Sequence, residues 1–313
     1  MKKVLASSET IREIVLNENI TNFDFRQYIE KGTPQHKPKP DVKFLQWFIG
    51  FVEAEGCFQR WKDKKKDWRF GLEITQKDPA LMYKIRTQLG FGKARSFTKA
   101  NGEVYGRFTI LNQIGLEALI LLVNGNLVTE KKQNQFLSWL QYFNERYNTA
   151  YVERGSGAVG LNNAWLSGFL EGDGGFDVSP PKHLVKATGS ESYISFIMKF
   201  YLTQKGEKTL LEKIALLFQI AAPIRTLTYG STTMYNRLET TNPTSLLLVL
   251  AYLKKYPFLG QRAIQLSRCS RVLPYLQNVY PSLTPKAFLK LQRLIQATKA
   301  PGKKKDQWKL KKI

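Results

Sequence analysis

The sequence predicts an α+β fold of two pseudo-symmetric halves, each with a four-stranded antiparallel sheet, joined through a pair of matching helices. Three observations lead to this fold class. A short motif at residues 163–176 occurs again 118 positions earlier in the chain. The same succession of helix-like and strand-like segments follows each copy. Within each half, strand-like segments come in pairs joined by turns, which is typical of antiparallel sheets kept apart from helices.

Each copy of the motif is an apolar, helix-like run that ends in two acids among glycines. Acids at a helix C-terminus lie at the negative end of the helix dipole, which costs about 0.3–1 kcal/mol. A local rule broken in this way usually marks a functional site, and its repetition indicates an internal duplication. The matched residues are Trp47, Gly50, Phe51, Glu53, Glu55, Gly56 and Phe58 in the first copy and Trp165, Gly168, Phe169, Glu171, Asp173, Gly174 and Phe176 in the second.

The elements of the first half follow from periodicity and turns. Alternating segments at 57–62 and 69–75 flank a charged turn, which predicts a hairpin. A helix at 79–89 comes next. A second strand pair is joined through Ala100, Asn101 and Gly102, a good two-strand turn. That pair covers 92–97 and 103–110, and helices at 114–123 and 130–147 complete this half.

The second half repeats this order. We expect strands at 175–179 and 193–203, a helix at 207–219, strands at 224–229 and 234–240, and helices at 243–255 and 259–276. The order helix, two strands, helix, two strands, helix, helix therefore occurs twice.

The domain boundaries follow from shifts in composition. Residues 1–40 are predicted to be an extension, with a short helix at 8–16 and a Pro- and Lys-rich linker at 31–40 that cannot form a core. The halves cover 41–149 and 161–280. A flexible join at 150–160 connects them. Residues 281–313 should form an amphipathic helix at 284–298 and then a solvated basic tail.

Charge indicates the kind of partner. Lys and Arg number 48 against 25 acids, a formal net charge of +23, whereas an ordinary small domain carries about 2–8 charges. This excess predicts a polyanionic partner, with nucleic acid ahead of an anionic membrane. No apolar run in the sequence approaches the roughly 20 residues that span a bilayer, so no membrane association is expected.

Composition also limits the chemistry. Two cysteines, Cys57 and Cys269, cannot build a disulfide framework or a zinc finger. With only His36 and His183, a metal site must rest on oxygen ligands, which suit Mg²⁺ or Mn²⁺.

Gly50 and Gly168 indicate that the two motif helices pack against each other. A glycine inside a helix costs roughly 0.5–1 kcal/mol against alanine, and a helix keeps it where two backbones approach closely. Packing through these glycines would bring Glu55 and Asp173 to the same edge. Two carboxylates that meet there would repel unless divalent cations lie between them, an arrangement that suits phosphodiester hydrolysis.

The segments 48–56 and 166–174 resemble the two signature helices of the LAGLIDADG homing endonucleases, in the monomeric two-motif form, and the resemblance extends over roughly residues 42–280. It implies that Glu55 and Asp173 bind catalytic Mg²⁺, with Mn²⁺ as a substitute. The earlier acids, Glu53 and Glu171, are then structural. A monomer is expected.

The resemblance implies further site residues. Gln76 and Gln204, each in a Thr-Gln-Lys sequence at a strand end, would support the water network around the metals, or be ordinary strand ends. Lys131 and Arg262 match a basic position near the cut phosphates. Arginine cannot give up a proton at accessible pH, so Arg262 would only stabilise charge. Neighbouring Lys132 leaves the first assignment open.

DNA recognition would belong to the two sheets, because a β-ribbon fits the major groove and alternate side chains reach base edges. Phe58, Leu72 and Ile74 should face the core instead. The groove-facing candidates are Gln59, Trp61, Arg69, Glu73, Thr75, Lys199, Tyr201, Arg225 and Arg237.

The resulting hypothesis is a site-specific DNA endonuclease that makes Mg²⁺-dependent double-strand breaks at a long asymmetric site and so promotes intron mobility. Two alternatives remain: a group I intron RNA maturase, which loss of a motif acid would favour, and a catalytically inactive DNA-binding protein. Family habit implies an organellar location, the mitochondrion ahead of the chloroplast.

Overall fold

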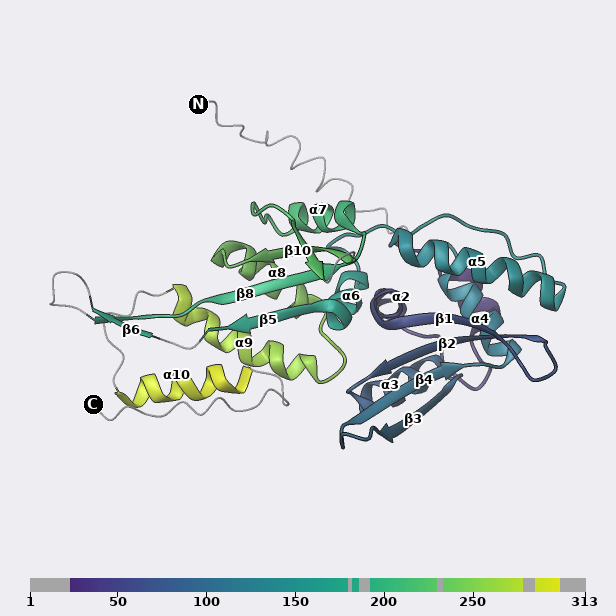
Figure 1. Ribbon diagram of the computed structural model, residues 1–313, viewed down its shortest axis with the longest axis horizontal. Helices are drawn as coiled ribbons and strands as arrows, with labels where there is room; N and C mark the ends of the chain where they lie inside the picture. Colours follow the sequence, from purple (N-terminus) through teal and green to yellow (C-terminus); the bar gives the residue numbers. More distant parts are fainter. Residues whose placement is uncertain (1–22, 180–181, 186–191, 230–232, 278–284, 299–313) are drawn as a thin grey trace, which may run out of the picture.

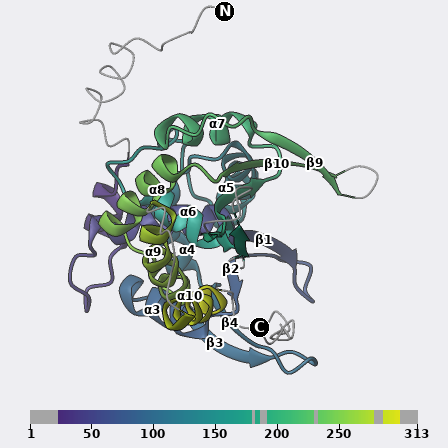
Figure 2. The same cartoon turned by 90° about the vertical axis from the view of Figure 1, so that its left-hand side faces the viewer.

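The structure is a computed structural model that describes residues 23–179, 182–185, 192–229, 233–277 and 285–298. The helix expected at 8–16 and the basic tail beyond residue 298 lie outside the described residues. Two groups of strands lie on either side of a central helix pair (Figure 1). Seen from the end, helices α3, α8 and α9 lie to one side, and strands β1, β3 and β9 extend to the other (Figure 2).

The first half has the elements that its periodicity predicts, each within a residue or two. They are α2 (Val42–Glu55), β1 (Gly56–Lys62), β2 (Trp68–Gln76), α3 (Pro79–Leu89), β3 (Lys93–Thr98), β4 (Val104–Ile110), α4 (Gln113–Val123) and α5 (Glu130–Tyr147). Turn and cap chemistry sets these limits. For example, Asp78 caps α3 by accepting a hydrogen bond from Leu81 N at 3.1 Å, and Gly90 ends this helix with a positive φ of 79°.

The second half follows the same order. It contains α6 (Trp165–Asp173), β5 (Gly174–Val178), β6 (Lys182–Val185), β7 (Ser192–Ser195), β8 (Met198–Gln204), α7 (Lys208–Leu217), β9 (Arg225–Tyr229), β10 (Thr233–Thr240), α8 (Pro243–Lys255) and α9 (Arg262–Gln277). Helix α10 (Pro285–Thr298) packs on α9 and buries Leu291 and Ile295.

The strands form two equivalent four-stranded antiparallel sheets, in the orders β1-β2-β4-β3 and β5-β8-β10-β9. The predicted α+β fold class is therefore confirmed. One prediction within it is wrong: residues 193–203 are not a single strand, because β7 and β8 are separate and β7 pairs with β6 in a small third sheet. Ser179 Oγ accepts a hydrogen bond from Ile197 N at 2.6 Å at this break. Pro180 and Pro181 follow in sequence, and proline has no N–H for a ladder.

Helices α2 and α6 lie side by side at the centre and join the halves. Their backbones touch at Gly50 and Gly168. A Cβ added to Gly50 would lie 2.0 Å from Trp165 O, and one added to Gly168 would lie 1.8 Å from Trp47 O. No larger residue fits at either position, so the two glycines allow this close crossing.

Part of the N-terminal segment belongs to the core. The expectation that residues 1–40 lie outside it is wrong for Phe23, Phe25 and Tyr28, which are buried. Closely spaced aromatic residues give this segment apolar area to bury. Asn126 fixes it further, because its side chain accepts from Asp24 N at 2.8 Å and donates to Asp24 O at 2.9 Å.

The connection at 150–160 has no helix or strand, and its backbone is hydrogen-bonded to the first half. Asn124 donates to Val152 O at 2.8 Å and accepts from Arg154 N at 3.1 Å. Gly157 N donates to Leu127 O at 2.9 Å. These backbone groups are paired with the first half, so the connection is attached to that half.

Among the described residues, no helix has both the length and the apolarity required to cross a bilayer.

Candidate active site

The two later motif acids end the paired helices. Glu55 is the last residue of α2 and Asp173 is the last residue of α6. After each acid, the chain enters a strand through a glycine with extended backbone, Gly56 or Gly174. Burial raises the pKa of Glu55, and the nearby charge of Asp173 raises it further. Burial likewise raises the pKa of Asp173. The two carboxylates thus lie close enough to repel each other in a half-buried place, where a cation would be favourable.

A glutamine at a strand end binds each acid. Gln76, the last residue of β2, donates from Nε2 to Glu55 Oε1 at 2.5 Å. Gln204, the last residue of β8, donates to Asp173 Oδ2 at 2.6 Å. Each bond orients one carboxylate oxygen and lowers the pKa of its acid, in opposition to burial. The second oxygen of each acid is the one a cation would take.

A basic side chain reaches the backbone beside each acid. Lys132 Nζ donates to the carbonyl of Gly56, and Arg262 Nη1 donates to the carbonyl of Gly174. Lys132, not Lys131, therefore occupies the place of Arg262. Burial, and then the charge of Lys131, lowers the pKa of Lys132.

Lys131 itself is exposed, but its charge lowers the pKa of Asp173, as do the charges of Arg262 and Lys132. All three basic side chains therefore act on the paired acids. The assignment of Lys131 to the cut phosphate stays a prediction.

The earlier motif acids point away from this pair. Glu53 accepts hydrogen bonds from Val128 N and Thr129 N, and burial raises its pKa to about 7. Glu171 accepts from Leu259 N and Gly260 N, and burial raises its pKa too. Backbone and indole N–H donors occupy their oxygens, which agrees with a structural role.

The donor set of the paired acids suits a hard divalent cation. No group of three or more His, Cys, Asp or Glu side chains capable of holding a metal exists among the described residues. Mg²⁺ does not need one, because it keeps several waters and binds through one or two carboxylates together with substrate phosphates. Glu55 and Asp173 can supply those carboxylates, so the residues present fit such an ion.

On the first sheet, the candidate recognition residues share one face. Gln59 and Trp61 on β1 have the same strand parity as Arg69, Glu73 and Thr75 on β2, and Trp61 pairs directly with Arg69. On β2 these residues alternate with buried Phe70, Leu72 and Ile74. The expectation that Phe58, Leu72 and Ile74 face the core is confirmed by their burial.

On the second sheet, the candidates gather around one acid. Glu239 lies 3.0 Å from Arg237 Nε and 3.7 Å from Lys199 Nζ, and it also binds Arg225. Arg237 lies over the ring of Tyr201, with its Cζ 4.3 Å from the ring centroid.

Sequence reasoning missed three basic residues on the first sheet: Lys93, Arg95 and Arg107. Arg107 pairs with Thr75 and Arg95 in register, so its side chain lies on the candidate face. The signal was in the sequence. Arg95 and Arg107 precede Arg225 and Arg237 by the same 130 positions.

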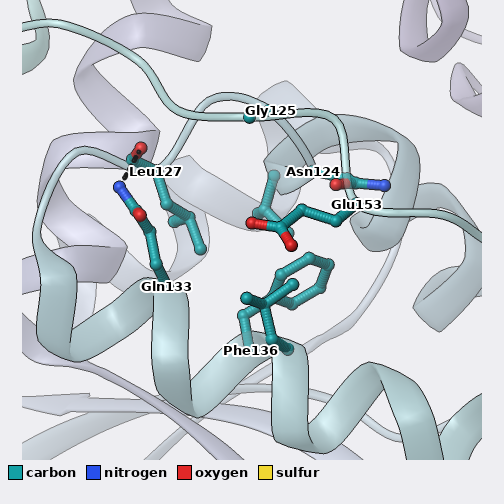
Figure 3. Close-up of a pocket in the computed structure, with 9 residues that line it drawn as sticks. Asn124, Gly125, Leu127, Gln133, Phe136 and Glu153 are labelled. Carbon is teal, nitrogen blue, oxygen red and sulfur yellow. Dashed lines mark hydrogen bonds between the residues drawn. The ribbon is translucent and has the colours of Figure 1, made fainter.

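A separate hollow lies between α4, α5 and the connection at 150–160 (Figure 3). The carboxylate of Glu153 lies over the ring of Phe136 there, and Asn124 and Gln133 line the sides. None of the paired acids or their glutamines contributes to it, so this hollow is not part of the candidate active site.

Paired helix-end acids between two equivalent sheets define a duplicated protein with one composite site. The LAGLIDADG endonuclease family model matches residues 48–143 and 166–273, so that each match contains one motif. The chain therefore belongs to the LAGLIDADG endonuclease family, as its motifs predicted.

Curated relatives come from intron-encoded proteins. The "Probable intron-encoded endonuclease 4" of Neurospora crassa is 33% identical over 176 residues, which are 55% of this chain and 30% of that protein. The "Probable intron-encoded endonuclease Cox1-I1b" of Schizosaccharomyces pombe is 24% identical over 262 residues, 74% of this chain and 64% of that protein. The chain thus spans about a third to two thirds of these relatives.

Solved structures share the fold. The LAGLIDADG homing endonuclease I-LtrWI bound to target DNA aligns with a TM-score of 0.64 at 18% identity, over 82% of this chain and 98% of that one. The LAGLIDADG meganuclease I-AabMI bound to uncleaved DNA aligns with a TM-score of 0.60 at 21% identity, over 80% of this chain and 98% of that one.

Proposed function

We propose that the protein is a site-specific homing endonuclease that cuts both strands of a long, asymmetric DNA duplex in a Mg²⁺-dependent reaction. The observation that carries this proposal is the duplicated set of three groups. Glu55, Gln76 and Lys132 recur as Asp173, Gln204 and Arg262, between two sheets with basic faces. Two such sets, related like the two strands of a duplex, suit one cut in each strand.

Double-stranded DNA is the proposed partner. The net charge of +23 favours a polyanion, and the sheet faces carry arginines that can read guanine in the major groove. The structural relatives I-LtrWI and I-AabMI were solved bound to DNA. Two unequal sets of face residues would read two unequal half-sites, so the target would be asymmetric.

In the proposed mechanism, Glu55 and Asp173 would hold the divalent cation, and Gln76 and Gln204 would keep the two carboxylates oriented. A bound Mg²⁺ would activate water and stabilise the leaving oxygen. Lys132 and Arg262 supply positive charge next to the cut phosphates. Of these two, only Lys132 can lose a proton at accessible pH, so the two centres need not be equivalent.

The test is incubation of the protein with a duplex that carries the uninterrupted host locus, in Mg²⁺, in Ca²⁺ and in EDTA. We expect double-strand cleavage only in Mg²⁺, and tight binding without cleavage in Ca²⁺. Tight binding with no product in Mg²⁺ would refute the nuclease proposal and leave a catalytically inactive binder.

A maturase function is the second candidate, because the "Intron-encoded RNA maturase bI4" of Saccharomyces cerevisiae is 28% identical over 135 residues, 43% of this chain and 19% of that protein. The presence of both motif acids favours cleavage. A splicing assay with the protein's own intron RNA distinguishes the two.

We also propose an organellar location, the mitochondrion ahead of the chloroplast, since relatives are named for cox1 introns. Cell fractionation tests this location.

A further inference from the structure

The turns before α5 and α9 are held in the same way. The N–H groups of residues 128–129 donate to Glu53 Oε1 at 2.9 and 2.6 Å. Those of residues 259–260 donate to the carboxylate of Glu171 at 2.8 and 2.6 Å. These residues lie in the turn just before each helix, where a buried backbone N–H needs a partner from elsewhere. The earlier acid of each motif therefore fixes the helix start of its own half.

Each of these acids is in turn bound by the indole of the opposite half. Trp165 Nε1 donates to Glu53 Oε2, and Trp47 Nε1 donates to Glu171 Oε2 at 2.9 Å. All four side chains are buried, with at most 5% of any of them exposed. Each half thus provides one indole N–H across the α2–α6 crossing, and this donor completes the hydrogen bonds of the other half's acid.

A second pair of acids crosses between the halves directly. Lys131 N, in the first turn of α5, donates to Glu207 of the second half at 3.0 Å. Gln261 N, just before α9, donates to Asp78 of the first half at 2.6 Å. Both acids are buried. Besides the acid of its own half, the start of α5 is thus held by a second-half acid, and the start of α9 by a first-half acid. We call these six residues the clasp: Trp47, Glu53, Asp78, Trp165, Glu171 and Glu207.

The two held helices carry the basic side chains of the active site. Lys132 follows the start of α5 and binds the carbonyl after Glu55, and Arg262 opens α9 and binds the carbonyl after Asp173. We propose that the clasp couples the two cutting centres reciprocally, so that each half positions the basic side chain of the other. The proposal rests on the endonuclease function proposed above. Its consequence is that neither centre is complete unless the halves are docked, which favours double-strand breaks over single nicks.

Two matched substitutions test the coupling. Trp165→Phe removes the donor to Glu53 and keeps the ring against Phe169, and Trp47→Phe does the same for Glu171 and Phe51. In both pairs the ring centroids are 4.8 Å apart. The substrate is a duplex recovered from a randomised library by binding to the protein, with both strands end-labelled. The cutting rate of each strand is then measured.

We expect opposite strand biases. Each variant should slow the cutting of one strand by about tenfold relative to the other, since a hydrogen bond to a charged group is worth on the order of a tenfold change. The strand that is slowed should differ between Trp165→Phe and Trp47→Phe. Glu207→Ala should have the same bias as Trp165→Phe, because Glu207 also holds the start of α5. The substitution should leave helix α7 intact, since the Glu207 side chain does not cap it. Equal slowing of both strands in every variant would overturn the proposal.

Amide hydrogen exchange gives a readout that needs no cleavage. Trp165→Phe should speed exchange at residues 128–129 but not at 259–260, and Trp47→Phe should do the reverse. Equal changes at both helix starts would contradict the clasp. If the native protein cuts no duplex in Mg²⁺, the proposed function fails, whereas the exchange pattern still decides whether the clasp exists.

Discussion

Glu55 and Asp173 have equivalent places but different lengths. Each ends a motif helix, each accepts a hydrogen bond from a strand-end glutamine, and each has a pKa raised by burial. The extra methylene of Glu55 lets its carboxylate extend further from the backbone. Together with Lys132 opposite Arg262, this gives two centres that share a plan and differ in detail.

Neutral replacements of these acids test their role. Glu55→Gln and Asp173→Asn keep the shape but remove the charge that a cation needs, so cleavage should fall by more than about 100-fold, since loss of a mere partner of a metal ligand costs 10–100-fold. Duplex binding, measured by fluorescence anisotropy in Ca²⁺, should change little. Glu145→Gln, on the exposed surface of α5, is the control. Full activity in either variant would contradict the assignment.

Buried Glu53 makes stability depend on pH. Its pKa is raised from 4.5 to about 7 by burial. The folded state therefore binds a proton that the unfolded state has lost between these values. The stability that protonated Glu53 contributes is full below about pH 4.5 and is lost as pH rises through about 7. Burial raises the pKa of Glu55, Glu171 and Asp173 in the same direction.

Urea unfolding at about pH 5 and about pH 8 measures this effect. We expect the free energy of unfolding to be lower at the higher pH, and Glu53→Gln to reduce the difference because the amide does not titrate. An unchanged difference in Glu53→Gln would show that Glu53 is not the group responsible.

Some residue roles could be assigned only from the three-dimensional structure. The choice between Lys131 and Lys132 depends on which one faces the motif, and adjacent residues on a helix point about 100° apart. Arg95 and Arg107 were within reach of sequence, because comparison with Arg225 and Arg237 would have found them. The cross-half bonds of Trp47 and Trp165 were not, since nothing local indicates where an indole N–H finds its partner.

At the scale of elements, periodicity was sufficient where one face of a strand is buried. The alternation of Phe58, Leu72 and Ile74 with polar residues predicted the sheet faces correctly. It could not predict the break between β7 and β8, because residues 193–203 keep an unbroken strand-like pattern and the break depends on the partner strand that pairs with them.

The helix crossing should tolerate no side chain at its glycines. In Gly168→Ala the new methyl would lie 1.8 Å from Trp47 O, a backbone atom that cannot move alone. We expect a loss of about 3 kcal/mol or more in the free energy of unfolding, at or beyond the upper end for overpacked cores. Thermal and urea unfolding measure it.

Gly102→Asn is the control for this substitution. Gly102 has a positive φ of 78° and nothing within 4 Å of an added Cβ, and asparagine tolerates this backbone conformation. Equal stability losses in the two variants would show that the crossing is not close-packed.

At the scale of the whole molecule, composition predicted a core and a basic surface but not what lies over the first half. Residues 23–28 and the connection at 150–160 both pack there, through buried Phe25 and Tyr28 and the side chains of Asn124 and Asn126. The Pro- and Lys-rich stretch at 31–40 and the glycines at 155 and 157 indicated segments outside the core, although residues 23–28 contain three aromatic side chains. The long-range hydrogen bonds of Asn124 and Asn126 attach both segments to the first half, and no local pattern in the sequence indicates such bonds.

The charge of the molecule should govern its affinity for DNA. If about six to ten phosphates are contacted, the affinity for a duplex should fall by about 10³–10⁵ between about 50 and about 200 mM salt, through release of counterions. Equilibrium binding over a salt series measures the slope. A dissociation constant that does not change with salt would contradict phosphate binding by the sheet faces.

The clasp also sets a compatibility rule for recombination between members of the family. A half taken from a relative would keep its own catalytic acid and its own sheet. Its tryptophan and its cross-half acid would, however, have to fit acceptors and donors on a different partner half. Successful chimeras should therefore be those in which the cross-half groups Trp47, Asp78, Trp165 and Glu207 match their partners in the other half. The connection at 150–160 should travel with the first half, to which it is bonded.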